Sequence, residues 1–189
     1  MFSQFRKIGS DIIRCISPEI CYGCGAALVQ ADHFACPLCL DHLPITNFHF
    51  LKENPFIDKF FGRVPIFSAG AMLYFSKDGI AKRLIHDLKY RNRPNLGERL
   101  GQHYGFALRQ SELFNSINVV VPVPLHKKRM ASRGYNQSET FARGLSKTLM
   151  VQMRNDCIIR SKPTKTQTRK TRIERFENVS GAFQVVRPE

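Results

Sequence analysis

Four cysteines near the N-terminal end of the chain form two pairs of identical spacing, Cys21 with Cys24 and Cys36 with Cys39. Zn²⁺ prefers four thiolates at the corners of a tetrahedron, about 2.3 Å from the metal, and two facing Cys-x-x-Cys turns provide that arrangement. Gly23 allows a positive φ angle that turns backbone N–H groups toward the sulfur atoms, as does Gly25. We therefore predict a closed zinc site that stabilises the fold of this segment and catalyses no reaction.

Two other uses of these cysteines are weaker explanations of the pattern. Disulfides need an oxidising compartment, but no export sequence is visible, and Cys15 and Cys157 would remain as extras. A thioredoxin-like redox pair explains one Cys-x-x-Cys and leaves the second unexplained. His33 and His42 are near enough to replace a ligand, but with four cysteines present we interpret them as surface residues or as neighbours of the ligands.

The charge of the chain is strongly positive and unevenly distributed. The 189 residues hold 29 Lys and Arg against 15 Asp and Glu, and 14 of the cations but only three acids lie between Lys127 and Arg175. Such a concentration favours phosphates, either on a nucleic-acid backbone or on a small polyphosphorylated ligand. A solvated basic surface is the alternative, and charge alone does not choose between them.

Length and hydropathy limit the class of protein. With 43% hydrophobic residues, the chain is neither a disordered tail nor a fibrous protein, and its length allows one substantial core and one small module. No run approaches the ~18 apolar residues of a membrane-spanning helix. We therefore expect a soluble, cytoplasmic protein.

The two segments that flank the cysteines have different patterns. Residues 1–20 place Phe5, Ile8 and Ile12 at helical spacing, which predicts an amphipathic helix. Its basic face could contact a membrane surface, although docking on the protein's own core is the more common role of such a helix. Residues 21–43 would be the zinc module, and residues 44–68, which are rich in proline and lack a clear period, would be a linker.

From Ala69 onward the pattern alternates between strands and helices. Residues 69–75 alternate as a strand does, and Ile80, Leu84 and Leu88 then predict a helix that ends near Tyr90. After a break at Pro94, residues 96–107 predict a second helix capped by Asn95.

The next segment is the most informative part of the chain. Residues 117–124 form a β-branched run, typical of a strand buried on both faces of a parallel sheet. A basic loop, residues 125–133, follows, and Asn136 with Glu139 predicts a capping box at the start of another helix. Ligands of open α/β sheets bind at the carboxyl ends of strands, where loop amides and helix N-termini favour anions. A short strand at 157–159 then leads into a polar segment.

Several of these motifs resemble those of the ComF family. They are Val121-Pro122-Val123-Pro124-Leu125-His126, Arg133-Gly134-Tyr135-Asn136-Gln137, Thr164-x-x-Gln167, Arg175-Phe176-Glu177-Asn178-Val179 with the later Phe183, and Leu88-Lys89-Tyr90. The resemblance covers nearly the whole chain and includes the cysteine pairs. It implies an α/β fold, in which residues 69–189 form a type I phosphoribosyltransferase-like parallel sheet flanked by helices, behind a small zinc ribbon. Proteins of this family are associated with DNA uptake in competent bacteria.

The resemblance also assigns roles to residues. It implies that one set binds the pyrophosphate of phosphoribosyl pyrophosphate: Pro124, Leu125, His126, Arg129, Arg133, Gly134, Tyr135, Asn136 and Gln137. A second set would lie on a flexible loop that closes over the site: Arg160, Lys162, Thr164, Gln167, Arg175 and Asn178. Closure of a lid excludes water, and cations stabilise pyrophosphate as it leaves. His126 is a candidate general base, with a packing or phosphate-facing role as the alternative.

One element of that family is missing from this sequence. Type I phosphoribosyltransferases have a strand that ends in two acidic residues and a Thr/Gly-rich loop that holds the ribose 5′-phosphate, which should follow Phe183. The 189 residues contain no Asp-Asp pair and no Thr-Thr-Gly. We therefore expect a domain that is incomplete at its C-terminal side, from a fragment or an interrupted gene. The chain alone would be inactive, and Mg²⁺ with phosphoribosyl pyrophosphate would bind in a full-length parent.

Three functions remain open at this stage. The first is a phosphoribosyltransferase-like protein of DNA uptake. The second is a module that binds single-stranded DNA through the basic segment, although that segment offers few aromatic side chains for base stacking. The third is a zinc-containing scaffold that recruits proteins of the competence machinery.

Overall fold

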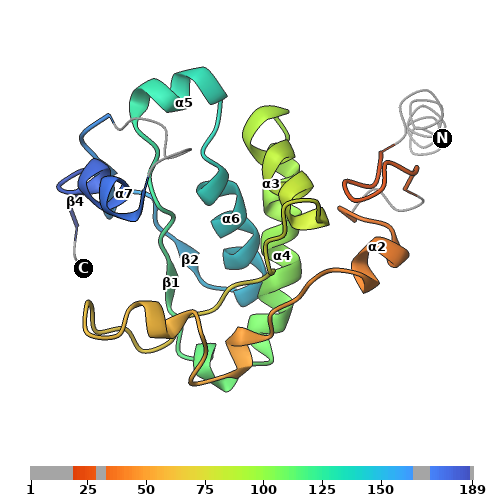
Figure 1. Ribbon diagram of the computed structural model, residues 1–189, viewed down its shortest axis with the longest axis horizontal. Coiled ribbons are helices and arrows are strands. Elements are labelled where there is room, and N and C mark those ends of the chain that lie inside the picture. Colours follow the sequence, from red (N-terminus) through yellow and green to blue (C-terminus); the bar gives the residue numbers. More distant parts are fainter. Residues whose placement is uncertain (1–18, 29–32, 164–170, 188–189) are drawn as a thin grey trace, which may run out of the picture.

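A computed structural model describes residues 19–28, 33–163 and 171–187 of the chain. It is a mixed helical and β structure with a small parallel sheet (Figure 1). Its helices are α2 (Pro37–Asp41), α3 (Ile80–Tyr90), α4 (Pro94–Arg109), α5 (Lys127–Arg133), α6 (Gln137–Leu149) and α7 (Arg172–Val179), with 3₁₀ helices η1 (Phe48–Phe50), η2 (Ile57–Lys59) and η3 (Glu112–Phe114). Its strands are β1 (Val119–Val120), β2 (Gln152–Met153), β3 (Ile158–Arg160) and β4 (Phe183–Val185).

Helices α4 and α6 pack closely because glycines face each other at their crossing. A Cβ atom on Gly101 would lie 2.1 Å from the carbonyl oxygen of Phe141, and one on Gly144 would lie 2.0 Å from the carbonyl oxygen of Glu98. Real Cβ atoms do not approach backbone so closely, and only glycine therefore permits this separation of the two helices. Figure 1 shows α6 between α4 and the β1–β2 sheet.

The sheet of β1 and β2 is parallel, with Val119 opposite Gln152 and Val120 opposite Met153. Helix α6 lies within the crossover between the two strands, as parallel pairing requires. The prediction of a long strand buried on both faces is wrong, because β1 has only two residues and 42% of the Val119 side chain surface is exposed. Pro122 and Pro124 lack the N–H groups that would extend the pairing.

A second sheet joins β3 and β4 in antiparallel register, with Ile159 opposite Gln184. The short strand predicted at 157–159 is confirmed, shifted by one residue. The strand predicted at 69–75 is wrong, since only an isolated bridge joins Leu73 to Ile45. Pro44 lies beside this bridge and has no N–H with which to continue a ladder.

The two helices predicted after residue 79 are present as α3 and α4. The predicted cap at Asn95 is wrong, because α4 begins at Pro94 with Arg93 in the capping position. Proline is well suited to the first helical position, where its missing N–H would have no partner in any case.

The segment after β1 is helical where a basic loop was predicted. Helix α5 is capped by the His126 ring, which accepts from the Lys128 N–H, and it ends at Gly134 with a φ of 77°. Asn136 caps α6 as predicted, by accepting from the Ser138 N–H. The predicted second half of the box is wrong, because Glu139 forms an ion pair with Arg143 instead.

A single cluster of buried side chains connects the cysteine module to α3 and α4. Its members are Cys21, Phe34, Ala35, Leu43, Ile80, Leu84, Leu96 and Leu100. Residues 44–68, interpreted above as a linker, contain η1 and η2 and the buried Asn54, whose amide donates to the carbonyl oxygen of Ala69. Residues 1–18 of the predicted N-terminal helix lie outside the described part of the chain. Among the described helices, none is long and apolar enough to cross a membrane.

Candidate functional site

The four predicted cysteines come together at one point. Their Sγ atoms all lie within 4.8 Å of one another, and those of Cys24 and Cys36 are 3.8 Å apart. Thiolates about 2.3 Å from a tetrahedral Zn²⁺ are separated by about 3.8 Å. Cys36 precedes α2 and Cys39 lies within it, so this short helix fixes the second pair. The donor set and its spacing fit a zinc ion.

Backbone N–H groups turn toward Cys21, as the sequence predicts. Its Sγ atom accepts from the N–H groups of Gly23 at 3.3 Å, of Cys24 at 3.5 Å and of Cys36 at 3.2 Å. Gly25 has a positive φ of 83°, but Gly23 is not among the residues with a positive φ, which corrects that part of the prediction. Gly23 is needed for space instead, because a Cβ atom there would lie 2.7 Å from Cys39 Sγ and from the Ile80 side chain.

The thiols differ in acidity, which bears on metal binding. Burial acts to raise the pKa of Cys21, but the donated N–H groups outweigh it and lower the pKa to about 6. Burial, reinforced by the neighbouring sulfurs, raises the pKa of Cys39 to about 12. Four adjacent thiolates therefore need a cation to coexist, and Zn²⁺ would supply that charge.

The segment assigned to pyrophosphate lies between the end of β1 and the start of α6, and several hydrogen bonds hold it. Asn136 donates from its amide to the Val123 carbonyl oxygen at 3.0 Å, and Arg133 donates to the Gln137 side-chain oxygen at 2.9 Å. The Tyr135 hydroxyl donates to the carbonyl oxygen of Leu88 on α3. The segment is thus tied to β1, α6 and α3.

Residues of the two predicted sets approach each other at Arg129 and Arg160. Burial lowers the pKa of Arg160, and the nearby charge of Arg129 lowers it further. Arg129 is on α5 and Arg160 at the end of β3, so the fold brings together cations that are distant in the sequence. Each of the two like charges raises the free energy of the other.

The remaining residues of the two predicted sets are more dispersed. Pro124, Leu125 and His126 connect β1 to α5, and the His126 ring serves as the helix cap described above. Lys162 lies beside Gly181, and Asn178 is on α7. Thr164 and Gln167 lie outside the described residues, as does the side chain of Arg175. The described members of the predicted loop thus lie at the end of β3, just after it and on α7, and the other three positions are undescribed.

Comparisons with known proteins match part of this chain to curated bacterial proteins. The chain is 29% identical over 103 residues to Competence protein F of Haemophilus influenzae, covering 53% of this chain and 45% of that protein. It is 28% identical over 108 residues to DNA utilization protein YhgH of Escherichia coli K12, covering 56% and 48%. These similarities support a ComF-family relationship. The chain spans about half the length of the curated relatives it matches. No protein-family model matches it, and no solved structure does.

Two features of the structure are not apparent from the sequence. One is a group of stacked side chains, in which the Arg93 guanidinium lies 4.8 Å from the centre of the Tyr22 ring and that of Arg133 lies 6.0 Å from the Tyr90 ring. The spacing of charges along the chain does not reveal it, because its members come from three separate segments, at Tyr22, at residues 90–93 and at Arg133.

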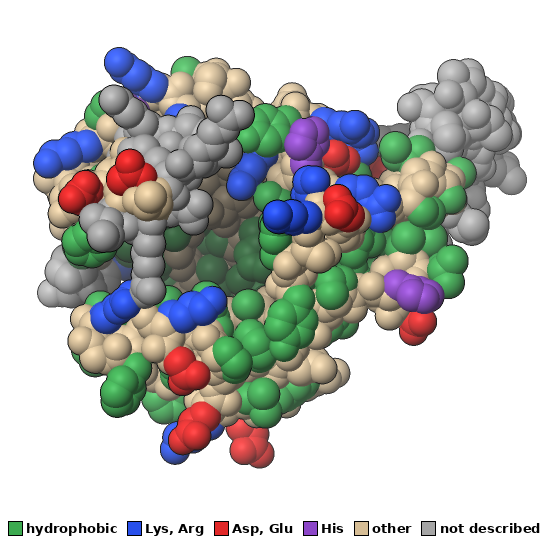
Figure 2. Space-filling view, in the orientation of Figure 1, with side chains coloured by type: hydrophobic (Ala, Val, Ile, Leu, Met, Phe, Trp, Pro, Cys, Tyr) green, Lys and Arg blue, Asp and Glu red, His purple; other side chains and the backbone are tan. Residues whose placement is uncertain are grey.

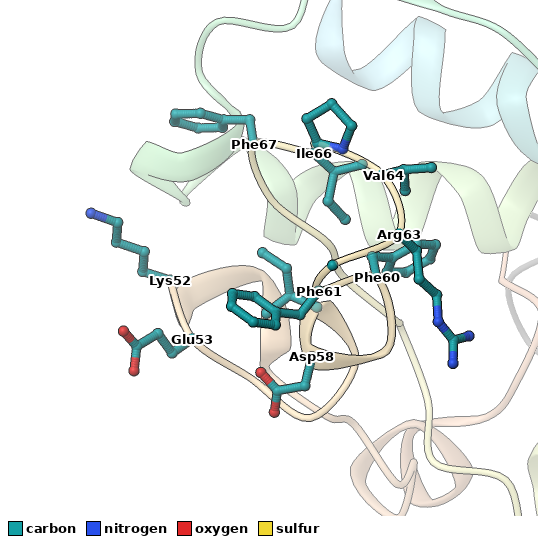
Figure 3. A pocket seen from close by; sticks show the side chains of 12 residues that line it. Lys52, Glu53, Asp58, Phe60, Phe61, Arg63, Val64, Ile66 and Phe67 are labelled. Carbon is teal, nitrogen blue, oxygen red and sulfur yellow. The ribbon is translucent and has the colours of Figure 1, made fainter.

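The other is a hollow of about 730 Å³ formed by residues 52–67 (Figure 3). Phe61 is 90% exposed at this hollow, and Phe67 is also exposed. Lys52 and Arg63 are balanced there by Glu53 and Asp58, so the lining has no net charge that would favour phosphate.

Proposed function

We propose that the protein handles DNA during uptake and binds phosphate groups at the carboxyl end of β1. The names of its relatives, Competence protein F and DNA utilization protein, support the first part. The second part rests on one observation: hydrogen bonds fix the segment between β1 and α6, and the Arg133 guanidinium there donates to the Gln137 side-chain oxygen at 2.9 Å. The nearby charge of Arg129 also contributes to lowering the pKa of Arg160. Arg129, Arg133 and Arg160 are all in the sets that the ComF resemblance assigns to the binding site and its closing loop.

Two ligands share the chemistry of this site, namely the pyrophosphate of phosphoribosyl pyrophosphate and the backbone of single-stranded DNA. Either would be held by the cations of α5 and β3 and by the segment that Asn136 fixes. Arg133 is already oriented by its bond to Gln137, so less side-chain entropy is lost when it binds an anion. The transfer of a phosphoribosyl group rests on the family resemblance alone, since the acidic pair is not in these residues. Phosphoribosyl pyrophosphate would bind with Mg²⁺.

We further propose that Zn²⁺ occupies the four-cysteine cluster in a structural role. The cluster offers four sulfur ligands and no position for a reacting water, which is the pattern of structural sites. The protein would act in the cytoplasm with proteins of the competence machinery. A scaffold without catalytic activity that binds single-stranded DNA is the second candidate, and the exposed Lys127 and Lys128 of α5 favour it.

A titration with a fluorescent 20-nucleotide oligothymidine tests DNA binding. The exposed Lys127 and Lys128 on α5 would contact the backbone, so their double substitution by Gln should weaken binding and reduce its dependence on salt. The matched control is Lys52→Gln with Arg63→Gln at the neutral hollow. Calorimetry with phosphoribosyl pyrophosphate and Mg²⁺ tests the other ligand. Binding of the oligonucleotide that ignores both salt and the α5 substitutions would contradict the proposal.

A further inference from the structure

A groove of about 470 Å³ separates the cysteine module from α3. Residues 20–25 form one wall, and Lys82, Arg83 and His86 on the exposed face of α3 form the other. The two walls are held in contact at Gly23, where a Cβ atom would lie 2.7 Å from the Ile80 side chain. Zinc at the cysteines would therefore fix the shape of the groove.

Positive charge exceeds negative charge along this groove. Its charged residues are Lys77, Lys82, Arg83 and Arg91, opposed by Asp78 and Asp87. In Figure 2, Lys and Arg side chains gather around a His over the part of the molecule where Figure 1 places α3. These cations lie outside the basic segment at 127–175, on the wall opposite the cysteines. Four thiolates with one Zn²⁺ would leave a charge of about −2 at the cysteine wall, so anions would be attracted to the α3 side of the groove.

The buried Asp87 organises the cations at one end of the groove. Its Oδ1 atom lies 3.4 Å from Arg91 Nε and 3.7 Å from His86 Nδ1, and its Oδ2 atom lies 4.0 Å from Arg93 Nη1. Asp87 is only 8% exposed, whereas the Arg91 and His86 side chains are more than half exposed. One buried carboxylate therefore holds the Arg91 and His86 side chains at the surface, in place for a ligand.

Aromatic rings continue from this end of the groove toward α5. Arg93 stacks on Tyr22 of the cysteine module, and Tyr90 is 67% exposed between the His86 ring, 5.0 Å away, and Arg133 of α5. Exposed rings beside cations provide stacking platforms for bases next to contacts for phosphates. A free phosphate would need the cations but would gain nothing from Tyr90.

We propose that this groove is a second contact for single-stranded nucleic acid, which runs from α5 past Tyr90 into the space between the cysteine module and α3. The inference rests on the proposed function and extends it to residues that the basic segment does not contain. It also links the zinc module to DNA binding, because the module forms one wall of the groove.

The test compares Lys82→Gln/Arg83→Gln with the control Lys52→Gln/Arg63→Gln in the full chain, using fluorescent oligothymidines of 20 and 6 nucleotides. For the 20-mer, the groove variant should bind about tenfold more weakly, and the slope of log affinity against log salt should shrink by about 1.4, which is 0.7 for each lost phosphate contact. The affinity for the 6-mer should fall less, because an oligonucleotide of this length can bind at α5 alone. The control should match the unmodified protein.

Tyr90→Leu provides a second measurement that does not depend on charge. It should weaken binding of the 20-mer severalfold while leaving the salt slope unchanged, because stacking releases no counterions. Phe106→Leu, another exposed aromatic residue, on α4, is the matched control.

Four outcomes would overturn the inference. An unchanged 20-mer affinity in the groove variant, while the α5 variant weakens it, removes the groove and leaves the proposed function standing. No binding of the 20-mer by the unmodified protein removes both. If Lys82→Gln/Arg83→Gln loses the binding of inorganic pyrophosphate, measured by calorimetry, but keeps its affinity for the 20-mer, the groove is a site for free anions. If the same variant holds less zinc and binds the 20-mer with unchanged affinity, Lys82 and Arg83 serve only to offset the charge of the thiolates.

Discussion

The Sγ atoms of Cys24 and Cys36 lie 3.8 Å apart, although one belongs to a turn and the other precedes α2. A disulfide would bring the two sulfurs to about 2.0 Å, whereas ligands of one tetrahedral zinc ion are separated by about 3.8 Å. The distance therefore fits two ligands of one metal ion, with Cys21 and Cys39 completing the set.

Cys24→Ser should abolish stoichiometric zinc binding and destabilise the cysteine module, because three thiolates hold zinc far less tightly than four. Zinc released on denaturation, measured with a colorimetric chelator, should fall from one equivalent to a small fraction. The control is Cys157→Ser, because Cys157 is outside the cluster. One equivalent of zinc in Cys24→Ser would show that this sulfur is not a ligand.

The parts of the molecule that depend on local sequence could be predicted, and those that depend on distant contacts could not. The spacing of Cys21 and Cys24 is short enough to fix a turn. The helical period of Ile80, Leu84 and Leu88 is sufficient to predict α3. The exposure of Val119 depends on which strands flank β1, which no local pattern determines. The groove beside α3 was missed for the same reason, since its walls are about 60 residues apart in sequence.

Two glycine patterns in the sequence also indicate structure, one within α4 and one at the end of α5. Glycines at Gly97, Gly101 and Gly105 recur every four residues, and this spacing puts a flat face on α4 for a neighbouring helix. The end of α5 is marked by Gly134, which adopts the left-handed conformation common after a last helical turn. The high charge of residues 127–133 favoured a loop and obscured that ending.

Gly101→Ala should lower the free energy of unfolding by about 1–3 kcal/mol, because the added methyl group would collide with the backbone of α6 and force the helices apart. Chemical denaturation monitored by circular dichroism measures the change. Phe106→Ala on the exposed side of α4 should stay within about 0.5 kcal/mol of the original. Equal stability of Gly101→Ala and the unmodified protein would mean that α4 and α6 are less tightly packed than described.

His49 should make the stability of the protein fall as the pH drops through 6.5, the pKa of an unperturbed histidine. The residue is buried, and neither ring nitrogen has a hydrogen-bond partner among the described residues. Burial lowers the pKa of His49 below its ordinary value of 6.5. As the pH falls through 6.5, the unfolded chain binds a proton that the folded chain does not, so the free energy of unfolding falls until the folded-state pKa is reached.

His49→Phe removes this titration and two unpaired buried nitrogens, so it should reduce the slope of stability against pH and raise stability at pH 5.5 by about 1 kcal/mol. Thermal unfolding at a series of pH values measures both effects. Some slope should remain from His103, whose pKa is also lowered by burial. The exposed His42→Phe serves as the control, and an equal change of slope there would exclude His49 as the source.

Asn136→Ala should impair both stability and ligand binding, because one side chain performs two tasks. Its oxygen accepts from the Ser138 N–H at the start of α6, and its amide donates to the Val123 carbonyl oxygen. Loss of the cap should cost about 1 kcal/mol, which denaturation measures. Loss of the bond to Val123 releases the segment that presents Arg133, so oligothymidine affinity should fall severalfold even at a temperature where the variant is fully folded. The exposed Asn118→Ala should change neither quantity. If Asn136→Ala is less stable but binds the oligonucleotide as before, the segment from Pro124 to Gln137 is a structural connection, and the phosphate contacts must lie elsewhere on the protein.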